Sequence, residues 1–262
     1  MVSPSATVRV LSIDATQGSR WLRGSVAFVW LATGLLVLHP YYREVGNAHL
    51  EPLGLGPWIM WATCAVEVAL GVRLALGPTS TWLVWVQVAM VSAHTLILAL
   101  SEPMLLVHPM GVLTKNLPLL AALGTAWLIE REGWSSRAVW LLRAGMAVIW
   151  ITEGIFPKIL FQQEMELAIA RESPLVWMDA SHFLTLLGVA QAASGMLALI
   201  LQRRWLRALL FVQGAALIAL PLLVSWNDVQ LWVHPLAPLT KTVPITVGTL
   251  LLAFHLRAEE ST

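Results

Sequence analysis

The sequence predicts an all-α, polytopic membrane protein with eight transmembrane helices, arranged as two four-helix bundles of parallel orientation. Hydrophobic residues make up 58% of the 262 positions and charged residues only 12%, whereas soluble domains carry roughly 25% charged residues. The second observation is an internal repeat, because residues 108–118 return as residues 234–244 with six of eleven positions identical. The chain is therefore a tandem duplication of a unit about half its length.

Each repeat contains four apolar segments close to the roughly 20 residues that cross a bilayer as a helix. Closed barrels need alternating ten-residue strands, and these segments are continuously apolar. The predicted spans lie near residues 22–39, 58–76, 81–100, 111–129, 139–157, 180–201, 205–224 and 238–256.

The chain divides into two repeats with short flanking segments. Residues 1–19 lack the apolar core and cleavage site of a signal peptide, so we expect a cytoplasmic lead-in. Four spans return the chain to its starting side, which gives both repeats the same orientation, unlike the inverted repeats of many transporters. The expected segments are the lead-in 1–19, the first repeat 20–130, a cytoplasmic linker 131–138, the second repeat 139–257 and a cytoplasmic tail 258–262.

The distribution of charge predicts the orientation. Eleven of the sixteen basic residues lie on the side that holds both termini and the even-numbered loops, and the positive-inside rule places that side in the cytoplasm. We expect a multi-pass protein of the cell (inner) membrane whose main partner is the lipid bilayer. The basic residues are spread along the membrane edges, so nucleic acid is not an expected partner. The single cysteine, Cys64, excludes a dithiol relay within this chain.

Polar residues inside spans are candidates for function, because burying charge in lipid is unfavourable. Glu153 and Lys158 flank Pro157 at the predicted outer end of the fifth span, and two lysines open the fourth and eighth spans. Most of these groups lie toward the outer half, which predicts a polar pocket in each repeat. The candidate ligand-binding residues are Glu67, Gln87, His94, His108, Lys115, Asn116, Glu153, Lys158, His234 and Lys241.

Two ion pairs are expected among these residues. Glu153 with Lys158, or Glu67 with Lys115, would keep both partners charged if they lie within about 4 Å. The structural alternatives are a helix-end ion pair next to Pro157, lysines that reach the membrane interface, and histidines that shape turns.

Metal and haem chemistry are not favoured. His94 and His182 are the one pair of span histidines suited to bis-imidazole ligation, and neither recurs in the other repeat. Metal-ligand spacings such as H-x-x-x-H are absent from the sequence, so no metal site is predicted. Gly71, Gly188 and Gly195 instead predict close helix packing.

Three segments together resemble the DoxX-like family of four-helix membrane proteins. They are residues 150–158 (WITEGIFPK), residues 188–195, and the pattern H-P-x-x-x-L-T-K-x-x-P at 108 and 234. The resemblance implies a four-helix bundle related to membrane subunits of thiosulfate:quinone oxidoreductase. The first repeat departs from the pattern, with Thr33 and Leu38 at the equivalents of Glu153 and Lys158.

The leading hypothesis is a membrane component that binds a lipophilic molecule, with a quinone as the suggested ligand. It would be at most the membrane subunit of a quinone-linked oxidoreductase, with a soluble or membrane redox partner as electron donor. No cofactor motif and no catalytic residue is identified. A non-enzymatic scaffold, anchor or assembly factor is the alternative, and a small-molecule transporter is the third.

Overall fold

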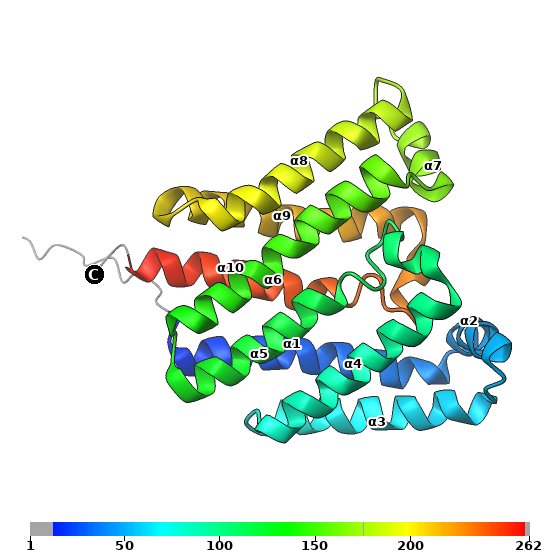
Figure 1. The fold of residues 1–262 in the computed structure, drawn as a ribbon, viewed down its shortest axis with the longest axis horizontal. Helices are drawn as coiled ribbons and strands as arrows, with labels where there is room; N and C mark the ends of the chain where they lie inside the picture. The colour runs from blue at the N-terminus through cyan, green and yellow to red at the C-terminus, as the bar shows by residue number, and fades with distance from the viewer. Residues whose placement is uncertain (1–12, 175, 260–262) are drawn as a thin grey trace, which may run out of the picture.

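The computed structural model describes residues 13–174 and 176–259, and all regular structure in these ranges is helical (Figure 1). Most of the predicted lead-in and tail lies outside these ranges. The helices are α1 Ala15–Leu35, α2 Pro40–Leu50, α3 Pro57–Leu76, α4 Thr81–Ser101, α5 Asn116–Glu132, α6 Ser136–Ile155, α7 Glu164–Glu172, α8 Ala180–Ile200, α9 Arg203–Asn227 and α10 Thr242–Glu259.

Six of these helices are long and apolar enough to cross a membrane: α1, α3, α4, α6, α8 and α9. The predicted fourth and eighth spans correspond to α5 and α10, which are shorter than the predicted segments. The starts expected at residues 111 and 238 were too early. Residues 112–115 and 238–241 form turns, and the helices begin at residues 116 and 242. Each turn directly follows a left-handed residue, Gly111 or Ala237, with φ angles of 63° and 54°, a conformation that lies outside the α-helix.

Helix ends follow the local sequence. Asp14 caps α1 by accepting a hydrogen bond from the Gln17 N–H at 2.7 Å, and Ser135 and Asp179 cap α6 and α8 in the same manner. After Ile155, the segment Phe156–Leu160 forms a π-helical turn that contains Pro157. This turn ends α6 and leads into the short helix α7.

Each repeat contains a short helix that the span prediction did not include. Helix α2 follows α1 in the first repeat, and α7 follows α6 in the second. Both are too short to cross a bilayer and mix polar with apolar residues. They lie at one end of the molecule, beside the long helices (Figure 1).

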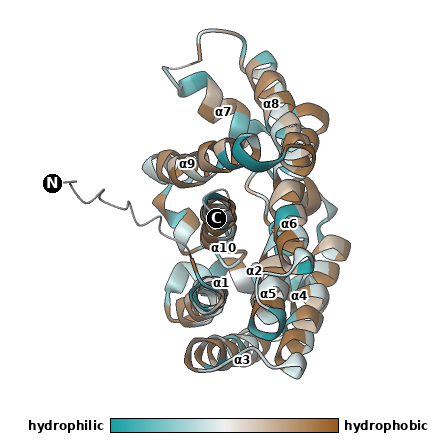
Figure 2. Cartoon of the chain, turned by 90° about the vertical axis from the view of Figure 1, so that its left-hand side faces the viewer, coloured by the Kyte–Doolittle hydropathy of each residue, from teal (hydrophilic) through white to brown (hydrophobic). Residues whose placement is uncertain are grey.

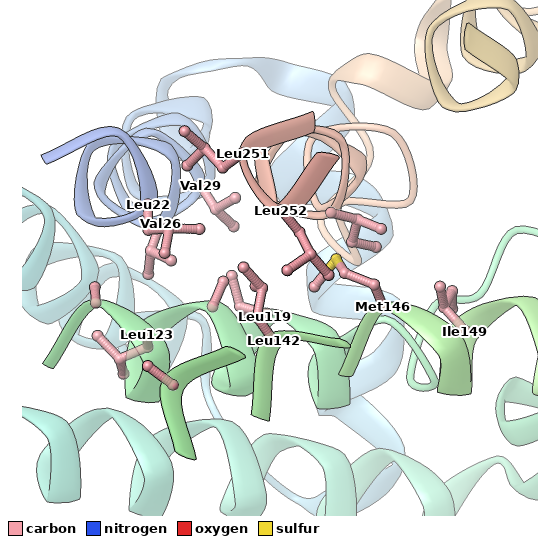
Figure 3. Close-up of a cluster of buried hydrophobic side chains, with 14 of the residues drawn as sticks. Leu22, Val26, Val29, Leu119, Leu123, Leu142, Met146, Ile149, Leu251 and Leu252 are labelled. Atoms are coloured by element: carbon pink, nitrogen blue, oxygen red, sulfur yellow. The ribbon is translucent and has the colours of Figure 1, made fainter. Parts of the chain in front are cut away.

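The hydrophobic core belongs to both repeats. Helices α1, α5, α6 and α10 pack against one another in the centre, while α3 packs on α1 and α8 packs on α6 (Figures 1 and 2). Leu22, Leu123, Leu142 and Leu252 come from the four central helices and join one buried cluster (Figure 3). The two expected four-helix bundles therefore share a single core.

The outer helices expose apolar side chains. Helices α4 and α9 are mostly uncovered within the molecule, and large side chains such as Trp85 and Leu223 are exposed there. In Figure 2 the long helices consist largely of hydrophobic residues. Trp58, Trp82 and Trp226 are exposed near helix ends, where tryptophan anchors a helix at a membrane interface. This exterior suits a lipid environment.

Candidate functional site

The two H-P-x-x-x-L-T-K segments, residues 108–115 and 234–241, fold as matching turns, which we call the His-Pro loops. The Nδ1 atoms of His108 and His234 accept hydrogen bonds from the N–H groups of Met110 and Leu236, each at 3.2 Å. Burial, followed by the nearby Lys115 charge, lowers the pKa of His108. Burial, followed by the charges of other histidines, lowers the pKa of His234 to about 4. Both rings are therefore neutral at pH 7 and shape the turns.

The lysines of the His-Pro loops connect the two repeats. Lys115 Nζ donates a hydrogen bond to the Pro238 carbonyl oxygen at 2.7 Å, and Lys241 Nζ donates to the Val112 carbonyl oxygen at 3.0 Å. Each lysine thus holds the loop of the other repeat. The two loops form one structure between the repeats.

The intramembrane carboxylates also have their electrostatic partners across the repeats. Glu153 accepts a hydrogen bond from the Thr114 hydroxyl at 2.5 Å and interacts with the charge of Lys115. Glu67 interacts with the charge of Lys241, and its Oε2 atom has no hydrogen-bond partner. The expected Glu67–Lys115 pairing was therefore wrong.

Lys158 pairs with α7 rather than with Glu153. Its Nζ lies 2.8 Å from Glu166 Oε1, and the two side chains are only 7% and 12% exposed. The expected Glu153–Lys158 ion pair was wrong, because the π-helical turn carries Lys158 toward α7. Glu166 was not among the predicted site residues. Its acidic, amphipathic segment indicated a helix, but nothing in the sequence indicated that this helix covers Lys158.

A cavity of about 710 Å³ lies in the second repeat, between α6, α7, α8, α9 and the His-Pro loops. This volume is typical of small-molecule sites. The walls are mostly apolar, with side chains such as Phe183 and Leu217. The polar lining residues are Lys115, Trp150, Glu153, Lys158, Glu166, Glu172, Ser173, Gln191, Trp226 and Thr242. An apolar cavity with a few polar groups suits a lipophilic ligand that has a polar part.

The other predicted site residues lie away from this cavity. Gln87 accepts a hydrogen bond from the Trp30 indole at 2.7 Å, and Asn116 donates one to the Thr95 hydroxyl at 2.8 Å. Both bonds lie within the first repeat and join α4 to its neighbours. Glu67 and Lys241 are also absent from the cavity wall.

The two span histidines lie on helices that are well separated. His94 is on α4 and partly buried, whereas His182 is exposed at the start of α8, with Nδ1 3.1 Å from Asp179 Oδ1. Helices α4 and α8 lie apart in both views (Figures 1 and 2). Within residues 13–174 and 176–259, no three His, Cys, Asp or Glu side chains are grouped in a manner suited to a metal ion.

The repeated architecture agrees with a comparison against protein families. The model of the DoxX-like family matches twice, at residues 27–124 and 147–250. The chain belongs to the DoxX-like family. Each match covers one repeat and extends from the first long helix to the last, so the protein is a tandem pair of DoxX-like units. Comparisons with curated proteins and with solved structures found no match.

Proposed function

We propose that this DoxX-like protein binds a lipophilic molecule in the cavity of its second repeat and acts as the membrane subunit of a redox system. The cavity carries the proposal, because its apolar walls enclose a polar end with Lys115, Glu153 and Lys158. A quinone fits this chemistry. Its reduction to a quinol takes up two electrons and two protons, and Glu153 is placed to transfer protons. We assign the electron supply to a partner protein.

The proposal includes eight spans with both termini in the cytoplasm of the cell membrane. Helices α5 and α10 lie in the centre and run alongside the longer helices (Figure 1). Because other helices surround them, they contact little lipid and need less apolar surface than the outer helices. The concentration of basic residues on the side of the termini supports the orientation.

The first experiment is a visible absorption spectrum of protein purified in mild detergent, followed by mass spectrometry of an organic extract. We expect a stoichiometric quinone or related lipophilic molecule. Recovery of bulk phospholipid alone would contradict the proposal and favour a membrane scaffold.

The Glu153→Gln variant tests the site itself. Removing the charge while keeping the shape is expected to lower ligand retention or quinone reduction at least about tenfold, in a variant that remains folded. Glu67→Gln is the matched control, because Glu67 is also an intramembrane carboxylate but lies outside the cavity. An equal loss of ligand retention or quinone reduction in both variants would contradict the assignment of the binding site to the cavity.

A scaffold is the second candidate function. The lysine bonds to backbone carbonyls between the loops and the buried Lys158–Glu166 pair are features that hold helices together. In that case Glu153→Gln would unfold the protein, and the extract would contain no specific ligand.

A further inference from the structure

In the described part of the chain, four buried polar atoms on the cavity wall have no hydrogen-bond partner: Trp150 Nε1, Thr242 Oγ1, Glu166 Oε2 and Gln191 Oε1. The Trp150 indole on α6 and the Thr242 hydroxyl on α10 can donate, whereas the Glu166 and Gln191 oxygens accept. Trp150 and Thr242 are 8% and 4% exposed. Buried polar groups are almost always paired, and an unpaired one calls for an explanation such as a ligand. Their position on the wall indicates where a bound molecule receives hydrogen bonds.

The equivalent groups of the first repeat are both paired. Trp30, the counterpart of Trp150, donates to Gln87 at 2.7 Å. Asn116, the counterpart of Thr242, donates to Thr95 at 2.8 Å. These two bonds join α4 to α1 and to α5. They lie where the repeat alignment places the cavity of the second repeat, so they hold the helices of the first repeat together at that position.

Neither bond is present in the second repeat, and the substitutions responsible can be named. Gln213, the counterpart of Gln87, donates its Nε2 to the Ser194 hydroxyl at 2.7 Å, and in this orientation its Oε1 has no partner. The first repeat has the apolar Leu70 at the position of Ser194. Pro221 replaces Thr95 and lines the cavity. The second repeat has therefore lost both contacts that close the first.

The first repeat is also filled by side chains at its outer end. Tyr42, Met60 and Cys64 form a small buried cluster, with the Tyr42 hydroxyl 3.7 Å from Cys64 Sγ. Leu38 stands at the position of Lys158 in the repeat alignment. A Cβ atom at Gly46 on α2 would lie 2.6 Å from Met60 Sδ, so Met60 fills the space beside α2.

We propose that only the second repeat holds ligand, and that the ligand is a neutral lipophilic molecule with a carbonyl-type oxygen that accepts a hydrogen bond from Trp150 Nε1. The Thr242 hydroxyl provides a second donor. Indole is a donor only, which requires an acceptor on the ligand. Lys115 and Lys158 already bond to Pro238 and Glu166, so no unpaired lysine favours an anionic ligand. This inference rests on the proposed function, and it specifies the ligand chemistry and the repeat.

The test compares two probes that differ in their acceptor oxygens. Decylubiquinone and decylbenzene are titrated into the purified protein in lipid nanodiscs, and bound probe is measured by mass spectrometry. We expect decylubiquinone to bind about tenfold more tightly, as loss of one good hydrogen bond implies. The Trp150→Phe variant should remove this difference. Its matched control, Trp30→Phe, should keep it.

A second variant tests the proposal without altering the cavity wall. Ser194→Leu copies the first repeat and removes the bond that orients the Gln213 amide. Its Oε1, which has no partner, can then turn to accept the Trp150 N–H. Ser194 does not line the cavity, so we expect a folded protein with about tenfold weaker decylubiquinone binding.

The possible outcomes separate the inference from the proposed function. Equal binding of both probes to the unmodified protein would overturn the acceptor assignment and leave a lipophilic site in place. An equal effect of Trp30→Phe and Trp150→Phe would overturn the assignment to the second repeat. If neither probe binds and the organic extract contains no ligand, the proposed function fails as well.

Discussion

At the residue scale, His234 shows how a turn makes stability depend on pH. Its Nδ1 atom accepts the Leu236 N–H, so the turn requires the neutral ring. Burial, then the charges of His49 and His108, lower its pKa to about 4 in the folded protein, whereas an unfolded histidine has a pKa of about 6.5. Between these values the unfolded chain binds a proton that the folded chain does not bind. Stability must therefore fall as the pH decreases through this range.

This argument predicts a lower thermal unfolding midpoint at pH 5.0 than at pH 7.5, measured in one detergent. The His234→Asn variant keeps a side-chain acceptor for the turn without the titration, so its midpoint should depend less on pH. The pKa of His108 is also lowered. His108 should therefore preserve part of the pH dependence of the unfolding midpoint in the His234→Asn variant. A midpoint that is unchanged or higher at pH 5.0 would contradict the assignment.

The candidate site residues could be predicted from the sequence better than their partners. Glu153, Lys158 and Lys115 were chosen as polar groups in apolar spans, and all three line the cavity. The partner of Lys158 was missed, because it depends on the position of α7, which no periodicity in the spans indicates. Trp150 was missed as well. Its significance comes from a lost hydrogen bond that only a comparison of the two folded repeats reveals.

At the element scale, glycines set the distance between α6 and α8. A Cβ atom at Gly154 would lie 2.5 Å from the Gly188 carbonyl oxygen, and a Cβ at Gly188 would lie 2.5 Å from the Gly154 carbonyl oxygen. Gly195 is similarly close to the Ala147 carbonyl, at 2.7 Å. The backbones of the two helices are therefore in contact. The sequence correctly predicted this role for Gly188 and Gly195, because small residues at a helix interface permit close approach.

Gly154→Val is expected to destabilise the protein by about 3 kcal/mol, because the added side chain must separate two backbones. Gly24→Ala on α1 is the control. A Cβ atom there meets nothing within 4 Å, and a helical Gly→Ala change should stabilise by about 0.5–1 kcal/mol. Measuring the free energy of unfolding of both variants in the same detergent checks this predicted difference. Similar stability of the two would show that α6 and α8 can move apart freely.

The helix boundaries were less predictable than the existence of the helices. The apolar content of the segments after the His-Pro loops suggested helix from residues 111 and 238, but a left-handed residue in each loop delays the start. Gly111 was a visible signal for such a conformation. Ala237 was not, since alanine rarely adopts a positive φ, and its conformation follows from the repeated fold.

At the scale of the whole molecule, the duplication produces one protein rather than two bundles. Helices α1 and α5 of the first repeat pack with α6 and α10 of the second, and the loop lysines bond across the repeats. The number of repeats and their lengths were readable from the sequence. The shared core was not, because every helix of a membrane protein is apolar and the sequence does not show which apolar faces meet.

The shared core depends on both repeats crossing the membrane in the same direction, and cysteine labelling tests this arrangement. The native Cys64 is buried, with 3% exposure, so it contributes little background. Glu102 and Glu164 follow α4 and α6, and Arg137 lies at the start of α6. A membrane-impermeant maleimide should label Glu102→Cys and Glu164→Cys in intact cells, but Arg137→Cys only after the cells are opened.

This pattern separates the proposed topology from its two competitors. If α5 did not cross the membrane, Arg137→Cys would be labelled in intact cells and Glu164→Cys would be protected. If both termini were outside, all three results would be reversed. Positions 102 and 164 lie outside and position 137 inside only if the N-terminal side is cytoplasmic and α5 crosses the membrane, as the proposed eight spans require. In that arrangement the His-Pro loops and the polar end of the cavity would lie on the outer side, so the proposed proton exchange at Glu153 would occur from that side.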